Sequence, residues 1–219
     1  MLTNADVARQ NMIENQVRPW EVLDPHVLDV LSAVRREDFV PARYRNLAFA
    51  DTALPLGHGE VMMKPIVEGR ALQALGLGSD DRVLEIGTGS GFLTACLARL
   101  AASVSSVEVH ADFAEAARAR IAASGAQNVR IEVADAVRGF NTTEPCDAVV
   151  VTGAVYSLPD RFRSWVAPHG RLFAIVGESP AMQAILYTRA GDSHWREESL
   201  FETDIPYLMH AAPPRRFSL

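Results

Sequence analysis

The stretch Val83-Leu84-Glu85-Ile86-Gly87-Thr88-Gly89-Ser90-Gly91 decides how this chain folds. It begins with an apolar run typical of a buried β-strand and continues with glycines at alternate positions. Residues 92–98 are mostly apolar and predict a buried helix directly after the glycines. A strand, a tight glycine turn and a helix open a βαβ unit of the nucleotide-binding type. Glycine lets the backbone approach a ligand closely, and the free N–H groups of the following helix point at that ligand.

The spacing of the glycines narrows the class of ligand. A dinucleotide-binding fingerprint reads G-x-G-x-x-G, whereas this turn reads G-x-G-x-G and has Phe92 where that fingerprint needs Gly or Ala. Because no Lys-Ser or Lys-Thr pair follows, a phosphate-binding P-loop is excluded. The G-x-G-x-G form after the acidic Glu85 resembles motif I of class I methyltransferases, which use S-adenosylmethionine. The competing interpretation is a glycine turn that only packs a helix on a strand.

Acidic residues at neighbouring strand ends support a cofactor site, because ligands of open α/β sheets bind at the carboxyl ends of the strands. Glu108, about 20 positions after the turn, can accept hydrogen bonds from a ribose diol. Asp135 follows the next predicted strand and can accept from an adenine amino group. S-adenosylmethionine has no phosphate and needs no basic residue, and its sulfonium tolerates acidic neighbours. The residues predicted to bind it are Glu85, Gly87, Thr88, Gly89, Ser90, Gly91, Glu108, Val109, Asp135 and Ala136.

Composition places the chain among ordinary globular proteins. Its 219 residues, 48% of them hydrophobic and 22% charged, suffice for one α/β domain with an extension. A net charge of -6 argues against nucleic acid or an anionic membrane as a partner. Cys96 and Cys146 give neither a disulfide framework nor metal-ligand spacing, so we expect no metal site. The start of the chain has no signal-peptide pattern and no apolar run is long enough for a bilayer, so we expect a cytoplasmic protein.

The order of predicted elements indicates a doubly wound, Rossmann-like α/β fold. Apolar or alternating runs predict strands at residues 83–86, 104–109, 129–135, 147–152, 170–176, 184–188 and 195–201. Helical patterns are found at residues 4–18, 25–34, 65–75, 92–98, 112–124 and 159–166. The link at residues 177–183 is too short for a parallel crossover, which needs roughly a dozen residues. We therefore predict a seven-stranded mixed sheet with antiparallel C-terminal strands.

The N-terminal part has helix signals but no strand run that can enter a parallel sheet. Asp24 and Pro25 form an N-cap followed by proline at the first helical position. The charged run at residues 35–38 is expected to be a solvated face, and residues 54–64 are expected to be a loop. We divide the chain into a helical extension with a substrate loop at residues 1–78 and an S-adenosylmethionine-binding α/β domain at residues 79–219. The two are expected to form one compact unit.

Several further segments resemble one family when they are taken in chain order. They are Phe39-Val40-Pro41, the LPLGHG segment at 54–59, the glycine turn, DAVVVT at 147–152 and PHGRL at 168–172. Over roughly residues 8–205 the chain resembles protein-L-isoaspartate O-methyltransferase. This resemblance implies a protein-repair enzyme that uses S-adenosylmethionine to methylate the free α-carboxylate of isoaspartyl residues. Such a carboxylate is ionised at pH 7 and needs positioning rather than a general base.

The substrate loop departs from the pattern that this resemblance implies. The family typically reads Gly-Gln-Thr-Ile-Ser-Gln-Pro, whereas residues 59–65 read Gly-Glu-Val-Met-Met-Lys-Pro. Met63 therefore stands at the position of the family serine, and Lys64 at that of the second glutamine. Gly153 replaces an alanine of the family, which we expect to be a small change, and the tail at residues 207–216 is atypical. The candidate substrate residues are His58, Met62, Met63, Lys64 and Thr152.

Different interpretations of this loop stay open. Lys64 can replace the lost hydroxyl as the partner of the substrate carboxylate, which keeps the isoaspartyl substrate. Alternatively, Met62 and Met63 line an apolar pocket for a different substrate, such as a small acid or phenol. The methionines can also be core residues beside a solvated lysine. A non-catalytic S-adenosylmethionine-binding protein would keep the cofactor site as well.

Overall fold

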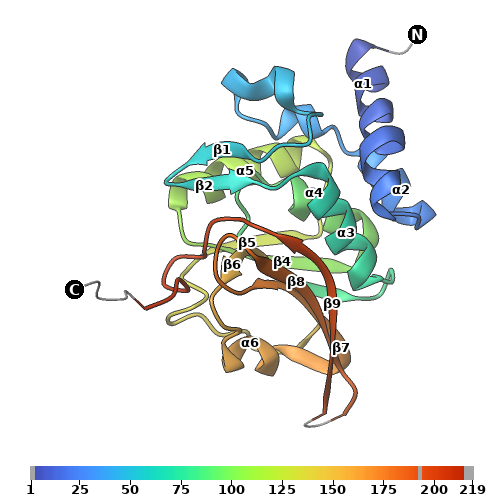
Figure 1. Ribbon diagram of the computed structural model, residues 1–219. Coiled ribbons are helices and arrows are strands. Elements are labelled where there is room, and N and C mark those ends of the chain that lie inside the picture. The colour runs from blue at the N-terminus through green and yellow to red at the C-terminus, as the bar shows by residue number, and fades with distance from the viewer. Residues whose placement is uncertain (1–2, 192–193, 215–219) are drawn as a thin grey trace.

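The computed structural model describes residues 3–191 and 194–214 and has a central seven-stranded sheet with helices on both faces (Figure 1). The strand order is β5-β4-β3-β6-β7-β8-β9. These strands are β3 (Arg82–Ile86), β4 (Ser103–Glu108), β5 (Val129–Val133), β6 (Cys146–Val155), β7 (Val166–Val176), β8 (Met182–Arg189) and β9 (Trp195–Thr203). The pairs from β5 to β7 are parallel, and β8 is antiparallel to both of its neighbours. The predicted mixed sheet with antiparallel C-terminal strands is confirmed.

Helices α3 (Pro65–Leu75), α4 (Phe92–Leu100) and α5 (Ala111–Ala123) lie on one face of the sheet, and α6 (Asp160–Ser164) lies on the other (Figure 1). Residues 134–145 connect β5 to β6 without a helix. Phe140 of this connection packs edge-on against Trp165, with ring centroids 5.4 Å apart. Trp165 Nε1 donates a hydrogen bond to Asn141 Oδ1 at 2.8 Å. An aromatic cluster therefore covers the second face where a further helix would otherwise lie.

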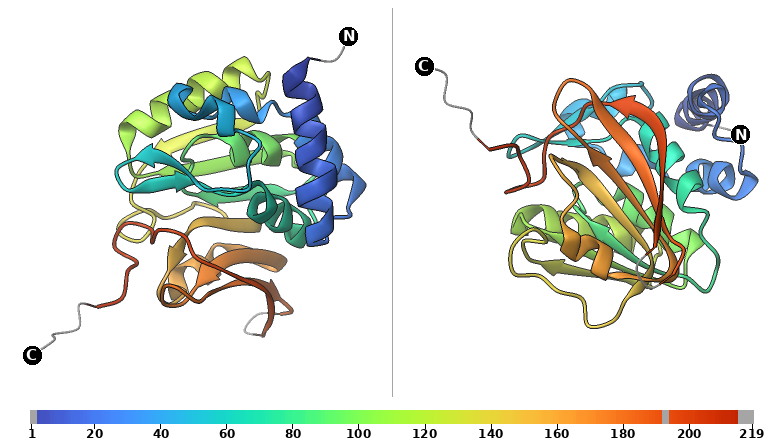
Figure 2. Two further views of the ribbon diagram at one scale, coloured as in Figure 1. Left: turned by 45° about the horizontal axis from the view of Figure 1, so that its top comes forward. Right: turned by 60° about the horizontal axis from the view of Figure 1, so that its bottom comes forward.

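The N-terminal helices pack beside α3 and α4, as the two views of Figure 2 show. Helix α2 (Pro25–Ala33) begins at the predicted N-cap, where Asp24 Oδ1 accepts from the His26 N–H at 2.8 Å. The helix predicted at 4–18 is instead α1 (Asn4–Met12) followed by a π-helical turn and a 3-10 turn. The shorter helical turns are η1 (Ile13–Val17), η2 (Arg18–Trp20), η3 (Arg36–Asp38) and η4 (Ala42–Leu47).

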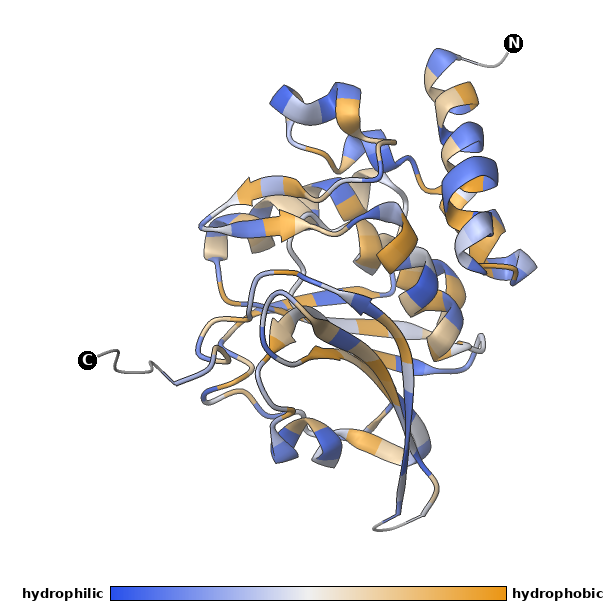
Figure 3. Cartoon of the chain, viewed as in Figure 1, coloured by the Kyte–Doolittle hydropathy of each residue, from blue (hydrophilic) through white to orange (hydrophobic). Residues whose placement is uncertain are grey.

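One hydrophobic core joins the N-terminal extension to the α/β part of the chain. Met12, Leu31 and Phe39 belong to the same buried cluster as Phe92 and Leu97. Apolar residues gather on the central strands β6 and β7 (Figure 3), where most side chains are buried. Within residues 3–191 and 194–214, no helix combines the length and the apolar character that crossing a membrane requires.

Residues 54–62 form a β-hairpin where the sequence predicted a loop. Strands β1 (Leu54–Gly57) and β2 (Glu60–Met62) pair antiparallel in a sheet of their own. His58 and Gly59 form the turn with φ values of 52° and 84°, and positive φ at both central residues suits a two-residue hairpin turn. The strands are four and three residues long, which is too short for a clear alternating pattern. The prediction was wrong for that reason.

The guanidinium of Arg36 binds the backbone at the end of this hairpin. Its burial shows that the expectation of a solvated face at residues 35–38 is wrong for Arg36. Arg36 is fully buried, and its Nη1 pairs with the carboxylate of Glu68. Its Nη2 donates to the Met63 carbonyl at 2.7 Å, and its Nε donates to the Ala48 carbonyl at 2.9 Å. The guanidinium also lies over the Phe92 ring, 4.7 Å from the ring centroid. Burial raises the pKa of Glu68 to about 7, although the positive charge of Arg36 lowers it.

We expect Arg36→Met to lower the free energy of unfolding by about 3–5 kcal/mol, because it leaves a buried carboxylate without its partner. The double variant Arg36→Met, Glu68→Leu should recover much of this loss, since it removes both charges. Urea unfolding followed by circular dichroism gives these values. The exposed Arg18–Glu14 pair is the control, and Arg18→Met should change stability by less than about 1 kcal/mol. A double variant no more stable than Arg36→Met would contradict the dominant role of the ion pair.

Candidate cofactor site

The glycine turn after β3 has a backbone conformation and close neighbours that disfavour any residue with a Cβ. Gly87 and Gly91 have φ values of 96° and 87°. A Cβ on Gly87 would lie 2.3 Å from Thr152 Oγ1, and one on Gly91 would lie 3.1 Å from the Cβ of Ala117 in α5. The alternate glycines therefore allow the turn to pack against β6 on one side and against α5 on the other.

Thr152 supports this turn from β6. Its Oγ1 lies 2.6 Å from the Gly87 carbonyl and 2.9 Å from the Ile86 carbonyl, so its one O–H is shared between two acceptors. The pairing of β6 with β7 is irregular between Val150 and Ala154, where Thr152 leaves the regular strand. This predicted substrate residue lines both of the cavities beside the turn.

Glu85 stabilises the turn from behind and lies outside both cavities, contrary to its prediction as a cofactor ligand. Its side chain is fully buried, and Oε2 accepts from Thr94 Oγ1 and Ser106 Oγ, each at 2.6 Å. Ser106 Oγ is in turn 2.6 Å from Thr88 Oγ1, so a chain of hydroxyl groups connects the carboxyl group to the turn. Burial raises the pKa of Glu85 to about 8, although both hydroxyl hydrogen bonds lower it.

Glu108, at the end of β4, faces the larger cavity as predicted. Its Oε2 accepts from the Gly89 N–H at 2.8 Å, and its Oε1 accepts from the His110 N–H at 3.0 Å. A carboxylate has about four lone-pair sites, so two remain for hydroxyl groups of a ligand. Glu60 lines the same cavity from the hairpin, and burial together with the negative charge of Glu108 raises the pKa of Glu60.

Asp135 lies two residues beyond the end of β5, at the opposite side of the larger cavity. Its Oδ1 accepts from the N–H groups of Val137 and Arg138 at 2.9 and 3.0 Å. Its Oδ2 lies 2.6 Å from Nδ1 of His210 in the C-terminal segment. Both oxygens of the carboxylate that is predicted to accept from an adenine amino group therefore already have partners within the chain.

The C-terminal segment 206–211 closes one side of the larger cavity. Ala154 N donates to Pro206 O at 2.9 Å, and Leu208 N donates to Ala154 O at 2.8 Å. A Cβ on Gly153 would lie only 2.7 Å from Leu208 Cδ2, so glycine at this position makes room for the segment. Replacing the family alanine by Gly153 is therefore not the small change that we expected. Residues 215 and 216 of the atypical tail lie outside the described residues.

Together these elements surround a cavity between the glycine turn, the hairpin, the start of α5 and the C-terminal segment. None of the described residues that line it is Lys or Arg, which suits a ligand without phosphate groups. Glu60, His110, Phe113 and Met209 also line it and were missed, because hairpin, helix and tail meet here only in the fold. The predicted cofactor residues that line it are Gly87, Gly89, Glu108, Val109, Asp135 and Ala136.

A smaller cavity adjoins the same turn and includes the substrate loop. Met62 and Met63 line it, and both side chains are buried. The predicted cofactor residues Thr88 and Ser90 line this cavity as well, while Gly91 lines neither cavity. The methionines therefore form an apolar wall beside the glycine turn.

Neither Lys64 nor His58 lines either of the two cavities at the turn. Lys64 lines a separate cavity together with Asp51, Arg70 and Asp204. The structure therefore does not bring Lys64 to the turn, where the interpretation in which it replaces the serine hydroxyl would need it. His58, at the tip of the hairpin, stacks on His110 with ring centroids 4.1 Å apart.

The doubly wound sheet, the G-x-G-x-G turn with Glu108 beside it, and a cavity with no Lys or Arg among its described lining residues are those of a Rossmann-like methyltransferase that uses S-adenosylmethionine. The family model of protein-L-isoaspartate(D-aspartate) O-methyltransferase matches residues 7–204. The chain belongs to this family, and the expected enzyme class and cofactor are confirmed. Segment 206–211 lies beyond the matched residues.

Proteins with this family name resemble the chain over most of its length. The protein-L-isoaspartate O-methyltransferase of Methylorubrum populi is 38% identical over 186 residues, which cover 85% of this chain and 87% of that protein. Protein-L-isoaspartate O-methyltransferase 1 of Anaeromyxobacter sp. is 41% identical over 174 residues, covering 79% of this chain and 82% of that protein. A beta-aspartate methyltransferase (PCMT) from Plasmodium falciparum, solved in complex with S-adenosyl-L-homocysteine, has a TM-score of 0.80 at 18% identity. It covers 94% of this chain and 99% of its own and shows the shared fold.

The buried Glu85 makes a pH-dependent contribution to stability. Its pKa in the folded chain is about 8, above the ordinary value of 4.5, so the folded state holds a proton that the unfolded state has lost. Stability from this group is therefore full below about pH 4.5 and is lost as the pH rises to about 8. We expect Glu85→Gln to gain stability relative to wild type between pH 5 and pH 8, measured by urea unfolding. Glu132→Gln, on an exposed side chain, is the control, and a pH-independent Glu85→Gln difference would contradict the assignment.

Gly153→Ala should displace Leu208 and loosen segment 206–211, because the added Cβ overlaps the leucine side chain. We expect faster amide hydrogen exchange in this segment, measured by mass spectrometry. The double variant Gly153→Ala, Leu208→Ala should restore much of the protection, since it removes the overlapping carbon atoms. Gly191→Ala is the matched control, because the added Cβ has no neighbour within 4 Å among the described residues. Unchanged exchange in Gly153→Ala would show that the segment is held in another way.

Proposed function

We propose that this chain transfers a methyl group from S-adenosylmethionine to the α-carboxylate of isoaspartyl residues in proteins and peptides. One observation carries the proposal: in a member of this family, the glycine turn separates a cavity that contains Glu108 from a smaller cavity that contains Met62 and Met63. The first cavity suits the cofactor, and the second lies where an acceptor group can approach it.

Different residues of the larger cavity suit different parts of the cofactor. Glu108 has lone pairs left for the two hydroxyl groups of a ribose. Backbone groups of Gly87 and Gly89 lie at the turn, where the amino-acid end of the cofactor can approach the main chain. Asp135 and Ala136 lie at the far side, which suits the adenine. With this arrangement the sulfonium would lie near the turn and Thr152, which lines both cavities.

The chemistry needs little from the protein beyond position and a dry environment. When bound, S-adenosylmethionine supplies a methyl group on a positively charged sulfur. An isoaspartyl carboxylate is ionised at pH 7 and attacks without losing a proton; an O–C bond forms and a C–S bond breaks. The products are a methyl ester and S-adenosylhomocysteine. Met62 and Met63 contribute by excluding water, and Arg36 contributes by holding the Met63 backbone in place.

Protein substrates and a cytoplasmic location belong to the same proposal. The net charge of -6 supports a protein substrate rather than a nucleic acid. Cys96 and Cys146 are both free and buried, which supports a reducing compartment.

The test is incubation of the full chain with methyl-labelled S-adenosylmethionine and a matched pair of peptides. We expect a base-labile methyl ester on the peptide with an isoaspartyl residue and none on the same peptide with an ordinary aspartyl residue.

Glu108→Ala should raise the KM for S-adenosylmethionine at least about tenfold, because its hydrogen bonds to the ribose are lost. Glu132→Ala removes the same charge from an exposed position and should leave this KM unchanged.

In the same assay, Met63→Ser distinguishes the role of the smaller, acceptor cavity from that of the cofactor cavity. Because Met63 lines only the smaller cavity, the variant should change kcat for the peptide and leave the KM for S-adenosylmethionine near the wild-type value. Methyl transfer to small carboxylic acids or phenols but not to the isoaspartyl peptide would overturn the proposed substrate. Tight cofactor binding without any methyl transfer would overturn the proposed activity.

A further inference from the structure

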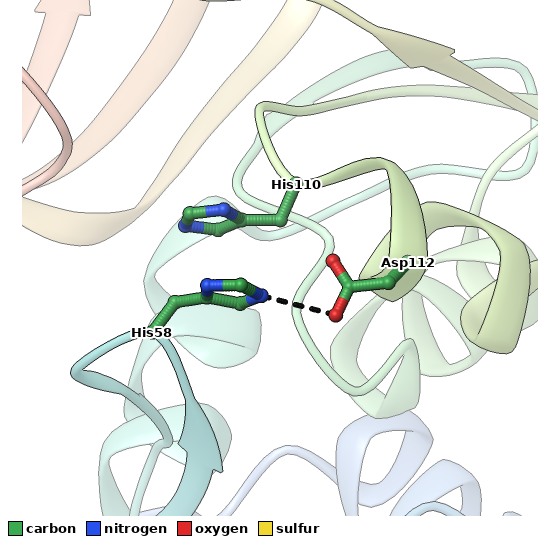
Figure 4. A group of neighbouring side chains, drawn as sticks. All are labelled: His58, His110 and Asp112. Carbon is green, nitrogen blue, oxygen red and sulfur yellow. Dashed lines mark hydrogen bonds and ion pairs between the residues drawn. The ribbon is translucent and has the colours of Figure 1, made fainter.

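We propose that His58, His110 and Asp112 form a binding site for a divalent transition-metal ion such as Ni²⁺, Co²⁺ or Zn²⁺ (Figure 4). His58 is at the tip of the β1–β2 hairpin, and His110 and Asp112 are at the start of α5. One ligand atom from each residue lies within 4.8 Å of the other two. The proposal concerns a site at the rim of the cofactor cavity and is independent of the methyl acceptor.

The chemistry of the three side chains matches a transition metal. Imidazole nitrogen is a preferred ligand of Ni²⁺, Co²⁺ and Zn²⁺, whereas Mg²⁺ and Ca²⁺ prefer sites made of oxygen. Two histidines and one carboxylate leave further coordination positions for water. Glu60 and Glu108 line the neighbouring cavity, so the surroundings favour a cation.

The contacts already present show which side chain has to move when an ion binds. His58 Nε2 lies 3.0 Å from Asp112 Oδ2, and the rings of His58 and His110 are stacked with an interplanar angle of 7°. A metal ion binds imidazole in the plane of the ring at roughly 2.0–2.1 Å, so one ring has to rotate out of the stack. The His58 side chain is 46% exposed at a hairpin turn, which leaves space for this rotation.

His110 can bind an ion without breaking a hydrogen bond of its Nε2 atom. Its Nε2 is buried, and among the described residues no hydrogen-bond partner is found for it. The ring can therefore change tautomer or orientation when an ion binds. Phe113 contacts both imidazoles edge-on, with ring centroids 5.2 and 5.3 Å away, and limits the directions that the rings can take.

A bound ion would join two elements that border the cofactor cavity. The hairpin contributes Glu60 and the start of α5 contributes His110 to the lining of that cavity. In the metal-free chain the described links between hairpin and α5 at this point are the imidazole stack, the edge-on contact of Phe113 with His58 and one exposed hydrogen bond. Coordination replaces this weak link by metal–ligand bonds and holds the hairpin against α5. The site was missed in the sequence because His58 and Asp112 are 54 positions apart.

The test uses the full chain without a histidine tag, titrated with Ni²⁺ in a calorimeter and with Co²⁺ under visible absorption. We expect one ion per chain, and excess Mg²⁺ should not compete. His58→Asn tolerates the positive φ of the turn, and His110→Phe keeps an aromatic ring in the stack. Each variant should lower the affinity for Ni²⁺ at least about tenfold.

A matched control is His26, which also lies beside a carboxylate, with its Nδ1 3.5 Å from Asp24 Oδ1. His26→Ala should leave Ni²⁺ affinity unchanged. In wild type, Ni²⁺ should also slow amide hydrogen exchange at residues 57–60, and His58→Asn should abolish this protection. The proposal is overturned if no saturable binding occurs, or if His58→Asn and His110→Phe bind Ni²⁺ as wild type does. Unaltered circular dichroism of the metal-free variants shows that they fold, and no outcome depends on methyl transfer.

Discussion

The buried positive charge of Arg36 is the constraint that the site depends on. A guanidinium inside a protein needs an opposite charge and acceptors for its hydrogens, and Arg36 finds them in Glu68, Met63 and Ala48. These groups come from α3, from the end of the hairpin and from the N-terminal segment. Any shift of one segment against the others would leave a charge or a donor unpaired. The methionine wall of the smaller cavity is therefore fixed by electrostatics as well as by apolar packing.

Glu85 and Glu108 both lie near the glycine turn, but one is a buried support and the other lines the cavity. Their positions along the strands account for this difference. Glu85 lies within β3 and is buried under α4, where hydroxyl groups are its partners. Glu108 is the last residue of β4, where the chain leaves the sheet and the side chain reaches the cavity. Both carboxyl groups act on the same turn. Glu85 reaches Thr88 through Ser106, and Glu108 binds the Gly89 N–H directly.

Much of the sheet and part of the site could be predicted from local signals. The glycine turn, the Asp24 cap and the short link before β8 depend on neighbouring residues, and the structure agrees with them. The rest depends on contacts that are distant in sequence. Arg36 belongs to a charged run, but it is buried and pairs with Glu68, which is 32 positions away. The need for glycine at position 153 is explained only by the nearby Leu208 side chain. Lys64 lines a separate cavity with Asp51, Arg70 and Asp204, and no sequence pattern reveals this grouping.

The bond between His210 and Asp135 has a consequence for any measured affinity of the cofactor cavity. A ligand that takes the place of His210 at Asp135 Oδ2 competes with the chain's own C-terminal segment, whose Leu208 N–H is also hydrogen-bonded to the Ala154 carbonyl. The observed dissociation constant then equals the intrinsic constant divided by the fraction of molecules in which the segment has moved aside. A change at His210, which does not line the cavity, would thus alter cofactor affinity through a population of conformations.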